Sequence, residues 1–446
     1  MASDLLSIAV SGARAARGAL DVTAQNIANA SSEGYVRRSL RISEVAASGG
    51  AGRVGDISLS GARIVEIRRN ADSFAQAEVR RTGSDLARAS TELAGLRNVE
   101  SGIEQSGLYS SIVEFEASLQ QLAGDPTDPS RRAQVLAEAT TLANKFNITA
   151  ASLDAVGAGL QFEAQAATAD INLVAGELSR INLRLSRAGA GSSDRAALLD
   201  QRDQMLERLS THAAISASFA ADGGVAVSIG ANPPRSLVSG GAAGTFTTTI
   251  IGDGTLQFDV DGQPTEVSGG ALGGAQAALR EASTIRSRLD ALAAGIAGTV
   301  NGVQANGAAL DGNAGQHIFS GSTAADLTVI MRDGAGIATA PATAGAGSRD
   351  PRNLVDLRAA LNTFAPAAGL SSLLFDVSSK VAGRTLTQSA LATIASSARV
   401  TLEQQSGVDL DAEAANLIRF QQAFQASGRA MQTASDIFDT LLGIGR

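Results

Sequence analysis

The spacing of apolar residues at both ends of the chain restricts its fold more than any other feature. Near the N-terminus such residues recur every seven positions, at Leu6, Ala13, Leu20 and Ile27. The same spacing returns near the C-terminus, at Leu410, Leu417, Phe424, Met431 and Phe438. A seven-residue repeat places these side chains on one stripe of an α-helix, the pattern of helices that pair along a seam. We therefore expect two terminal helices that pack against each other or against further copies of the chain.

The N-terminal stripe is weak because alanine makes up much of it, with Ala9, Ala16 and Ala30 beside Ala13. Burial contributes about 25 cal/mol for each Å² of apolar surface, so an alanine seam stabilises a helix only slightly. We expect both terminal helices to be poorly ordered in the isolated chain and to become ordered on assembly.

Helical periodicity also dominates the middle of the chain. It runs through residues 84–122 and then, after the GDPTDP break at 124–129, from about 130 to 187. Proline ends a helix, while Asp and Thr favour the start of a new one. Further helices are expected at 194–210, at 275–305 and from about 352 to the C-terminus, with a break near 365–370.

Residues 213–270 have a strand-like rather than a helical sequence pattern. VAVSI at 225–229 alternates apolar with small or polar residues, and IGDGTLQFDVDG contains a turn at Asp253 and Gly254. Alternation and a glycine turn are typical of short antiparallel strands. The predicted fold class is mainly α: an elongated multi-domain rod of long coiled-coil-like helices, with N- and C-termini paired and a small β domain inserted.

We divide the predicted rod into three domains. A terminal helical assembly domain combines residues 1–45 and 370–446, and a helical rod domain with irregular loops combines 46–211 and 272–369. The inserted β domain is 212–271.

Composition excludes most catalytic classes. The chain has no cysteine and only two histidines, His212 and His317, so thiolate chemistry and a His-rich metal cage are excluded. No phosphate-binding G-x-x-x-x-G-K-[ST] loop occurs, and the formal net charge of −8 argues against nucleic-acid binding. We predict no catalytic, cofactor-binding or metal-binding residues, no cofactor and no enzymatic activity.

The N-terminus, MASDLLSIAV, has no basic start followed by an apolar block, so a cleaved secretory signal is not expected. The uncharged run at 291–310 contains Asn, Gln, Thr and several glycines. A membrane span needs about 20 predominantly apolar residues, so we expect no association with a membrane.

Residues 11–39, SGARAARGALDVTAQNIANASSEGYVRRS, resemble the N-terminal signature of the axial proteins of the bacterial flagellum, which form its rod, hook and junctions. The match includes a polar turn after the first helix, formed by Asn26, Asn29, Gly34 and Tyr35. The sequence continues as GYVRR, where members of this superfamily usually read GYSRQ.

We expect the polar turn to end the first helix. Asn29 or a neighbouring residue would cap the helix, since Asn tolerates left-handed geometry, and Gly34 would supply conformational freedom. Tyr35 would pack its ring against a neighbouring helix. The turn would then set the angle at which one subunit meets the next.

The C-terminus resembles one branch of this superfamily. The run EAANLIRFQQAFQAS within residues 406–444 is similar to the hook-associated protein 1 family, the first hook–filament junction proteins. Residues 142–154, 198–210 and 289–319 resemble internal segments of the same family. Another hook or rod component of the superfamily and an unrelated coiled-coil adaptor are the alternatives.

The resemblance implies a structural protein that assembles as a ring or tube on the distal end of the hook. It implies export through the flagellar type III apparatus without a cleaved signal, and an extracellular location in the flagellum. The implied partners are further copies of the chain, the hook protein, the second junction protein and an export chaperone.

Overall fold

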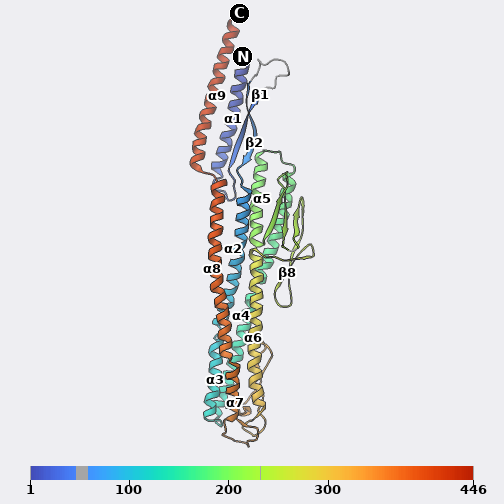
Figure 1. Ribbon diagram of the computed structural model, residues 1–446, viewed down its shortest axis with the longest axis vertical. Coiled ribbons are helices and arrows are strands. Elements are labelled where there is room, and N and C mark those ends of the chain that lie inside the picture. The colour runs from blue at the N-terminus through green and yellow to red at the C-terminus, as the bar shows by residue number, and fades with distance from the viewer. Residues whose placement is uncertain (1, 47–58, 232, 445–446) are drawn as a thin grey trace. The chain divides into compact units, whose positions relative to one another are not determined.

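The computed structural model describes residues 2–46, 59–231 and 233–444. Long helices make up most of it, which confirms the predicted mainly-α class (Figure 1). The helices are α1 (Ala2–Ala28), α2 (Ser73–Glu104), α3 (Leu108–Gly124), α4 (Pro129–Leu185), α5 (Ser193–His212), α6 (Gly270–Ala305), α7 (Arg352–Phe364), α8 (Pro366–Ser406) and α9 (Leu410–Ile444).

Apart from the first two, the described strands have five residues or fewer. A hairpin joins β1 (Arg38–Ala46) and β2 (Leu59–Arg69). The predicted β insertion contains β3 (Ile215–Phe219), β4 (Val225–Ile229), β5 (Arg235–Ser239), β6 (Ala242–Ala243), β7 (Phe246–Ile250), β8 (Leu256–Val260) and β9 (Gln263–Thr265). Two-residue strands follow α6: β10 (Gly307–Ala308), β11 (Phe319–Ser320), β12 (Thr328–Val329) and β13 (Ala340–Pro341). Within the insertion, β3 to β6 form one sheet and β7 to β9 another.

Helix boundaries follow local chemistry. The GDPTDP break separates α3 from α4, and Asp128 Oδ1 accepts the Ser130 N–H at 2.7 Å at the start of α4. Asp409 Oδ1 accepts the N–H groups of Asp411 and Ala412 at the start of α9. These aspartates satisfy N–H groups that have no partner within the first turn of a helix.

The β1–β2 hairpin was not predicted. Its strands pair in antiparallel register from Arg38 opposite Arg69 onward, with a shift between Arg41 and Ile42. Both strands are rich in arginine, and the register shift interrupts the alternation that would mark them as strands. The segment 47–58, which the predicted rod domain includes, lies outside the described residues.

The chain forms two compact units. Unit 1 comprises Met1–Ser84, Asp170–Phe246 and Ala392–Arg446, and unit 2 comprises Asp85–Ala169 and Thr247–Leu391. The cuts fall inside α2, α4, β7 and α8 rather than at the predicted domain boundaries. The division into three domains therefore stays a prediction.

Unit 2 has a large aromatic and aliphatic core. The core buries three phenylalanines completely or nearly so: Phe115, Phe146 and Phe319. The rings of Phe115 and Phe319 meet edge to face, with 5.7 Å between their centroids. The predicted inner stripe of α4 is buried in this core at Leu142, Phe146 and Leu153, and Leu160 further along the helix is also buried. Arg132 is also buried, and its guanidinium donates to the carbonyls of Pro126 and Ile337 at 2.7 and 2.8 Å.

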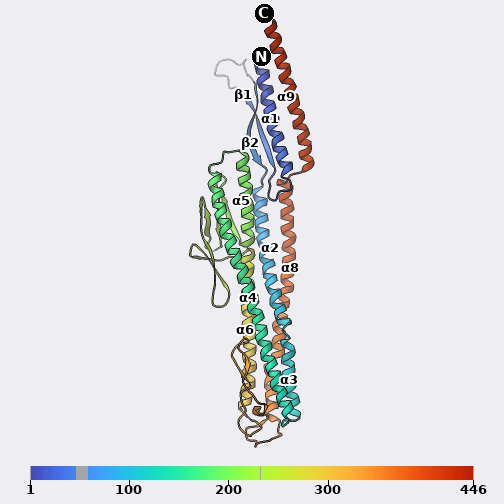
Figure 2. The ribbon, with the colours of Figure 1, turned by 180° about the vertical axis from the view of Figure 1, so that it is seen from behind.

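In unit 1, α1 has one face against α9 and another against the β1–β2 hairpin (Figures 1 and 2). Small residues allow this close packing. A Cβ added to Gly18 would lie 2.7 Å from Ile64 Cδ1, and Ser11 Oγ accepts the Ala62 N–H at 3.1 Å.

The β3–β6 sheet is attached to α4 through Asn182, whose side-chain amide donates to the carbonyls of Val225 and Gly240.

Candidate assembly site at the chain termini

The predicted pairing of the terminal helices occurs within one chain. Helix α1 packs against α9, and its buried positions are mostly small side chains, which include Ala9, Ala13 and Ala16. A Cβ on Gly12 would lie 3.1 Å from Ser427 Oγ of α9, so the two backbones approach closely. Helices with small residues at their contact can pack at short range but bury little apolar area.

The predicted interface residues divide into two groups. Ala13 is buried, and Leu20, Leu417 and Met431 are half-buried by contacts within the chain. The others are exposed, by 36% for Ile27 up to 53% for Leu410, and this group also includes Leu6, Phe424 and Phe438. The pair α1–α9 therefore carries large apolar side chains that contacts within the described part of the chain leave exposed.

Asn26 holds the base of α1 to the first strand. Its Nδ2 donates to the Arg38 carbonyl at 2.8 Å, and its Oδ1 accepts the Arg38 N–H at 3.0 Å. The buried amide thus pairs with both backbone groups of Arg38, as a neighbouring strand would.

The helix ends at Ala28, as the polar turn predicts, but the geometry at Asn29 differs from the prediction. Asn29 is not in the left-handed region, and its Nδ2 caps the helix by donating to the Gln25 carbonyl at 2.8 Å. Gly34 does take the left-handed conformation, with φ at +72°. A Cβ there would lie 2.5 Å from Gln204 Cγ on α5, so glycine is required for two reasons.

Tyr35 closes the turn against its own helix and strand. Its hydroxyl donates to Asn26 Oδ1 at 2.9 Å, and the Arg38 guanidinium lies 5.0 Å from the ring centroid. Burial raises the pKa of the Tyr35 hydroxyl, and the nearby Arg38 guanidinium partly opposes that change. The ring therefore stays neutral and acts as a packing and hydrogen-bonding group.

The segment after the turn reaches the other terminal helix. The Arg37 N–H donates to the Ser406 carbonyl at 2.9 Å, at the end of α8. Arg37 Nε pairs with Glu413 Oε1 of α9 at 2.6 Å, and Glu413 is buried. The polar turn thus links α1 to the start of α9.

A buried charge network, which we did not predict, fixes the hairpin to α5. Arg38 and Arg69 both bond Asp200, at 3.0 and 2.8 Å, and Arg69 also bonds Asp203 at 2.8 Å. Asp203 accepts further bonds from Gln76 at 3.0 Å and from Arg202 at 2.6 Å. Burial raises the pKa of Asp200, and the two guanidinium groups act in the opposite direction. Arg38 lies in GYVRR, Asp200, Arg202 and Asp203 lie in DQRDQ at 200–204, and Arg69 and Gln76 lie in neither segment, so no local pattern connects the members of the network.

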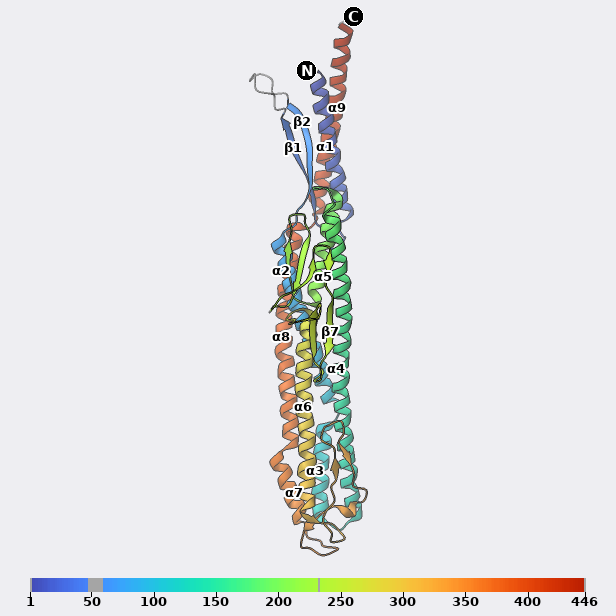
Figure 3. The same ribbon diagram turned by 90° about the vertical axis from the view of Figure 1, so that its right-hand side faces the viewer.

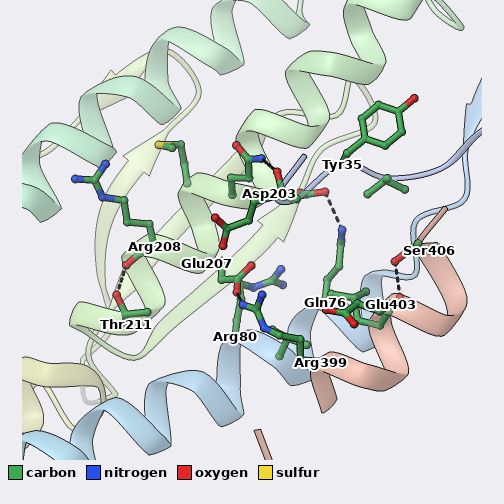
Figure 4. Close-up of a pocket in the computed structure, with 18 residues that line it drawn as sticks. Tyr35, Gln76, Arg80, Asp203, Glu207, Arg208, Thr211, Arg399, Glu403 and Ser406 are labelled. Carbon is green, nitrogen blue, oxygen red and sulfur yellow. Dashed lines mark hydrogen bonds and ion pairs between the residues drawn. The ribbon is translucent and has the colours of Figure 1, made fainter. Parts of the chain in front are cut away.

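A cavity of about 640 Å³ lies beside this turn, between α2, α5 and α8 (Figure 4). Figure 4 shows Arg80 and Arg399 reaching toward Glu207, with which Arg399 forms an ion pair. Burial lowers the pKa of Arg80. The cavity has mixed charge, and no histidine lines it.

The two histidines have different surroundings. His212 Nε2 lies 2.7 Å from Asp170 Oδ2, and Arg208 pairs with the same carboxylate, while His317 is exposed. Within the described residues, no three His, Asp or Glu side chains are placed to hold a metal ion. None of the described helices is long and apolar enough to span a membrane.

Two family models match the ends of the chain. A model of flagella basal body rod proteins matches residues 6–35, which are α1 and the polar turn. A model of the C-terminal region of flagellar basal body rod FlgEFG proteins matches residues 402–444, which include α9. The paired termini are therefore those of an axial protein of the bacterial flagellum.

A third model identifies the branch. It describes the helical domain of the flagellar hook-associated protein FlgK and matches residues 93–319, just over half of the 446 residues. The chain belongs to the FlgK family of flagellar hook-associated proteins. It is thus a structural component of the flagellum, of the hook–filament junction class.

Curated relatives agree with this family along most of the chain. Flagellar hook-associated protein 1 of Escherichia coli is 25% identical, over 99% of this chain and all of the relative. The Bacillus subtilis protein of the same name is 24% identical, over 97% of this chain and 96% of the relative. A solved structure, the flagellar hook junction protein FlgK of Burkholderia pseudomallei, shares the fold with a TM-score of 0.50 and 23% identity. The matched region is 55% of this chain and 46% of the Burkholderia pseudomallei chain.

Proposed function

We propose that the chain assembles through α1 and α9 into a ring on the distal end of the hook and connects the hook to the filament. The observation that carries this proposal is the exposed apolar surface of the terminal pair. Leu410, Phe424 and Phe438 are each more than 40% exposed on α9.

The energetics favour a partner for this surface. Burying one Leu or Phe side chain contributes about 1.5–3 kcal/mol, so several such residues left in water favour association. The contact between α1 and α9 within one chain consists largely of alanines, so it leaves these Leu and Phe side chains exposed. Identical subunits that meet through two different faces form closed rings or open tubes.

The polar turn has a distinct role in this proposal. Asn26, Gly34 and Tyr35 fix the end of α1 against β1 and α5, and Arg37 fixes the start of α9 through Glu413. These contacts set the direction of the terminal pair relative to the rest of unit 1. The turn thereby sets the angle at which neighbouring subunits meet.

We assign further copies of the chain, the hook protein and the second junction protein as partners. An export chaperone would cover the exposed face of α9 before assembly, because Phe424 and Phe438 would otherwise favour aggregation. The chain would be exported without a cleaved signal and would act outside the cell, as a structural protein with no enzymatic activity.

The test replaces two exposed side chains together, Phe424→Asp with Phe438→Asp. Both lie on the outer surface of α9, so the variant should keep the helical content and melting temperature of the unchanged chain. We expect it to be missing from isolated hooks and filament protein to be released into the medium. Electron microscopy and immunoblotting of flagella measure both effects.

The matched control adds the same charge to the same helix at exposed polar positions, Gln421→Asp with Gln432→Asp. This variant should assemble normally. Normal assembly of the Phe424→Asp, Phe438→Asp variant would contradict the proposal, as would equal loss of assembly in the control.

A further inference from the structure

Unit 2 carries an exposed apolar stripe on α4, on the side of the helix away from its buried stripe. Its members share the spacing i, i+4, i+7, i+11, i+15 and i+18, so they follow one face of the helix. Phe162 is 72% exposed, and all its companions are alanines. The stripe consists of Ala151, Ala155, Ala158, Phe162, Ala166 and Ala169, all exposed.

A second exposed stripe lies on the part of α8 that belongs to unit 2. Phe375 and Leu386 are 73% and 75% exposed, and the residues between and after them are small. The stripe consists of Phe375, Ser379, Ala382, Leu386 and Ala390, all exposed, with the same spacing from i to i+15. Figure 3 shows α8 and α4 along opposite sides of unit 2, with α6 between them.

The two stripes carry opposite charge. Between Phe146 and Ala169, α4 has two acidic residues, Asp154 and Glu163, and no basic residue. Between Phe375 and Ala390, α8 has two basic residues, Lys380 and Arg384, and one acidic residue, Asp376, which pairs with Arg288 at 2.8 Å, so this stretch has a net charge of +1. Such separation favours contact between one stripe and the other and disfavours contact of either stripe with its own copy.

These charges are accessible to a second chain. Lys380 pairs with Glu281 at 2.5 Å and Arg384 with Glu92 at 2.9 Å, yet their side chains are 49% and 47% exposed. Asp154 pairs with Arg286 and is 63% exposed. Glu163 is exposed and has no ion-pair partner among the described residues.

We infer that the α4 stripe of one subunit packs against the α8 stripe of the next, in a head-to-tail contact between copies of this chain. This inference rests on the proposed ring and names the faces of unit 2 that close it. Shape supports it as well as charge. Phe162 faces a stripe with small residues at Ser379, Ala382 and Ala390, and Phe375 and Leu386 face alanines, so bulky side chains can enter the gaps of the opposite helix.

A second copy is the occupant that these observations favour. A stripe packed against its own copy would bring the acidic residues of α4 near one another, or the basic residues of α8. Contact between two different faces on opposite sides of one unit repeats from subunit to subunit, which is what a ring requires.

The test uses the absence of cysteine from the chain. A full-length variant with Ala166→Cys and Ala382→Cys replaces the natural copy in the bacterium, and isolated flagella are treated with a short bis-maleimide. We expect a ladder of cross-linked multimers on a denaturing gel. Either single variant alone should remain monomeric, and the two single variants expressed together should give dimers only.

Two controls define the position of the contact. Ser287→Cys, at an exposed site on α6, combined with Ala382→Cys should give no ladder. Adding Phe162→Asp to the double-cysteine chain should lower the yield of multimers at least tenfold. Adding Phe74→Asp, at an 81% exposed site of unit 1, should leave the yield unchanged.

The outcomes separate this inference from the proposed function. If the double-cysteine chain enters flagella but gives no ladder, or if Ala166→Cys alone gives dimers, the head-to-tail contact is wrong while the proposed function stands. If the unsubstituted chain is absent from the hook–filament junction, the proposed function fails and the ring contact fails with it.

Discussion

The core of unit 2 and the terminal helices of unit 1 use opposite means of packing. In unit 2, Phe115, Phe146 and Phe319 are buried among leucines and isoleucines. In the terminal pair, the buried positions of α1 are mostly alanines, while Phe424 and Phe438 of α9 face outward. Unit 2 thus buries its largest aromatic side chains in a core formed within one chain. The terminal pair leaves the phenylalanines Phe424 and Phe438 exposed, and we propose that other subunits cover them.

The largest effect should come from the core of unit 2. Phe146→Ala removes a completely buried ring and should lower the free energy of unfolding by about 4 kcal/mol, through lost transfer energy and a cavity. Phe424→Ala, on the exposed face of α9, should change it by less than about 1 kcal/mol. Urea unfolding followed by circular dichroism measures both, and equal losses would remove the distinction between the two regions.

The buried charge network should give the next largest effect. Asp203→Asn weakens bonds from Arg69, Gln76 and Arg202 and leaves buried guanidinium groups without their counter-charge, so unit 1 should lose about 3 kcal/mol. The control, Asp21→Asn on the exposed face of α1, should stay within about 0.5 kcal/mol. Differential scanning calorimetry resolves the change, and an unaltered melting profile for Asp203→Asn would contradict the role given to the network.

The polar turn should give a smaller effect. Gly34→Ala places a Cβ in the left-handed region and against Gln204, at a cost of about 1–2 kcal/mol. Gly428→Ala, in the middle of α9 with open space around it, should instead stabilise by about 0.5–1 kcal/mol. Thermal unfolding of the two variants measures both changes in stability. If both variants are stabilised, or both are destabilised, the role given to Gly34 in the turn is wrong.

The smallest effect is a dependence of unit 1 on acid. Burial acts to raise the pKa of Asp170, but hydrogen bonds from Arg208 and His212 outweigh it and hold that pKa below its usual range. The resulting stabilisation is complete above the unfolded value of about 3.9 and is lost as pH falls through the lower folded value. Because the pair is near the surface, we expect less than about 1 kcal/mol, absent in Asp170→Asn. Unfolding curves at pH 3 and pH 6 measure it, and an unchanged pH dependence in the variant would contradict it.

The sequence predicts the helices well because their information is local. The buried stripe of α4 repeats with helical spacing over many turns, and the GDPTDP break places its start at Pro129. The position of the β insertion followed in the same way from alternation and the Asp253–Gly254 turn.

The sequence predicts long-range polar contacts poorly. Arg38 meets Asp200 and Arg69 meets Asp203 over separations of more than 130 residues, and no local periodicity marks such pairs. The unpredicted β1–β2 hairpin has a related consequence. It covers a second face of α1, which includes Ser11 and Gly18, so the seven-residue stripe alone could not show which side chains remain exposed.

The central claim is that the terminal helices gain their stability from neighbouring subunits, whereas the core of unit 2 does not. Hydrogen exchange of the monomer and of the assembled junction, followed by mass spectrometry, tests it directly. We predict fast exchange in roughly the first and last 35–45 residues of the monomer, slow exchange in α3 and the first half of α4, and strong protection of the termini only after assembly. Strong protection of α1 and α9 in the monomer would contradict the claim.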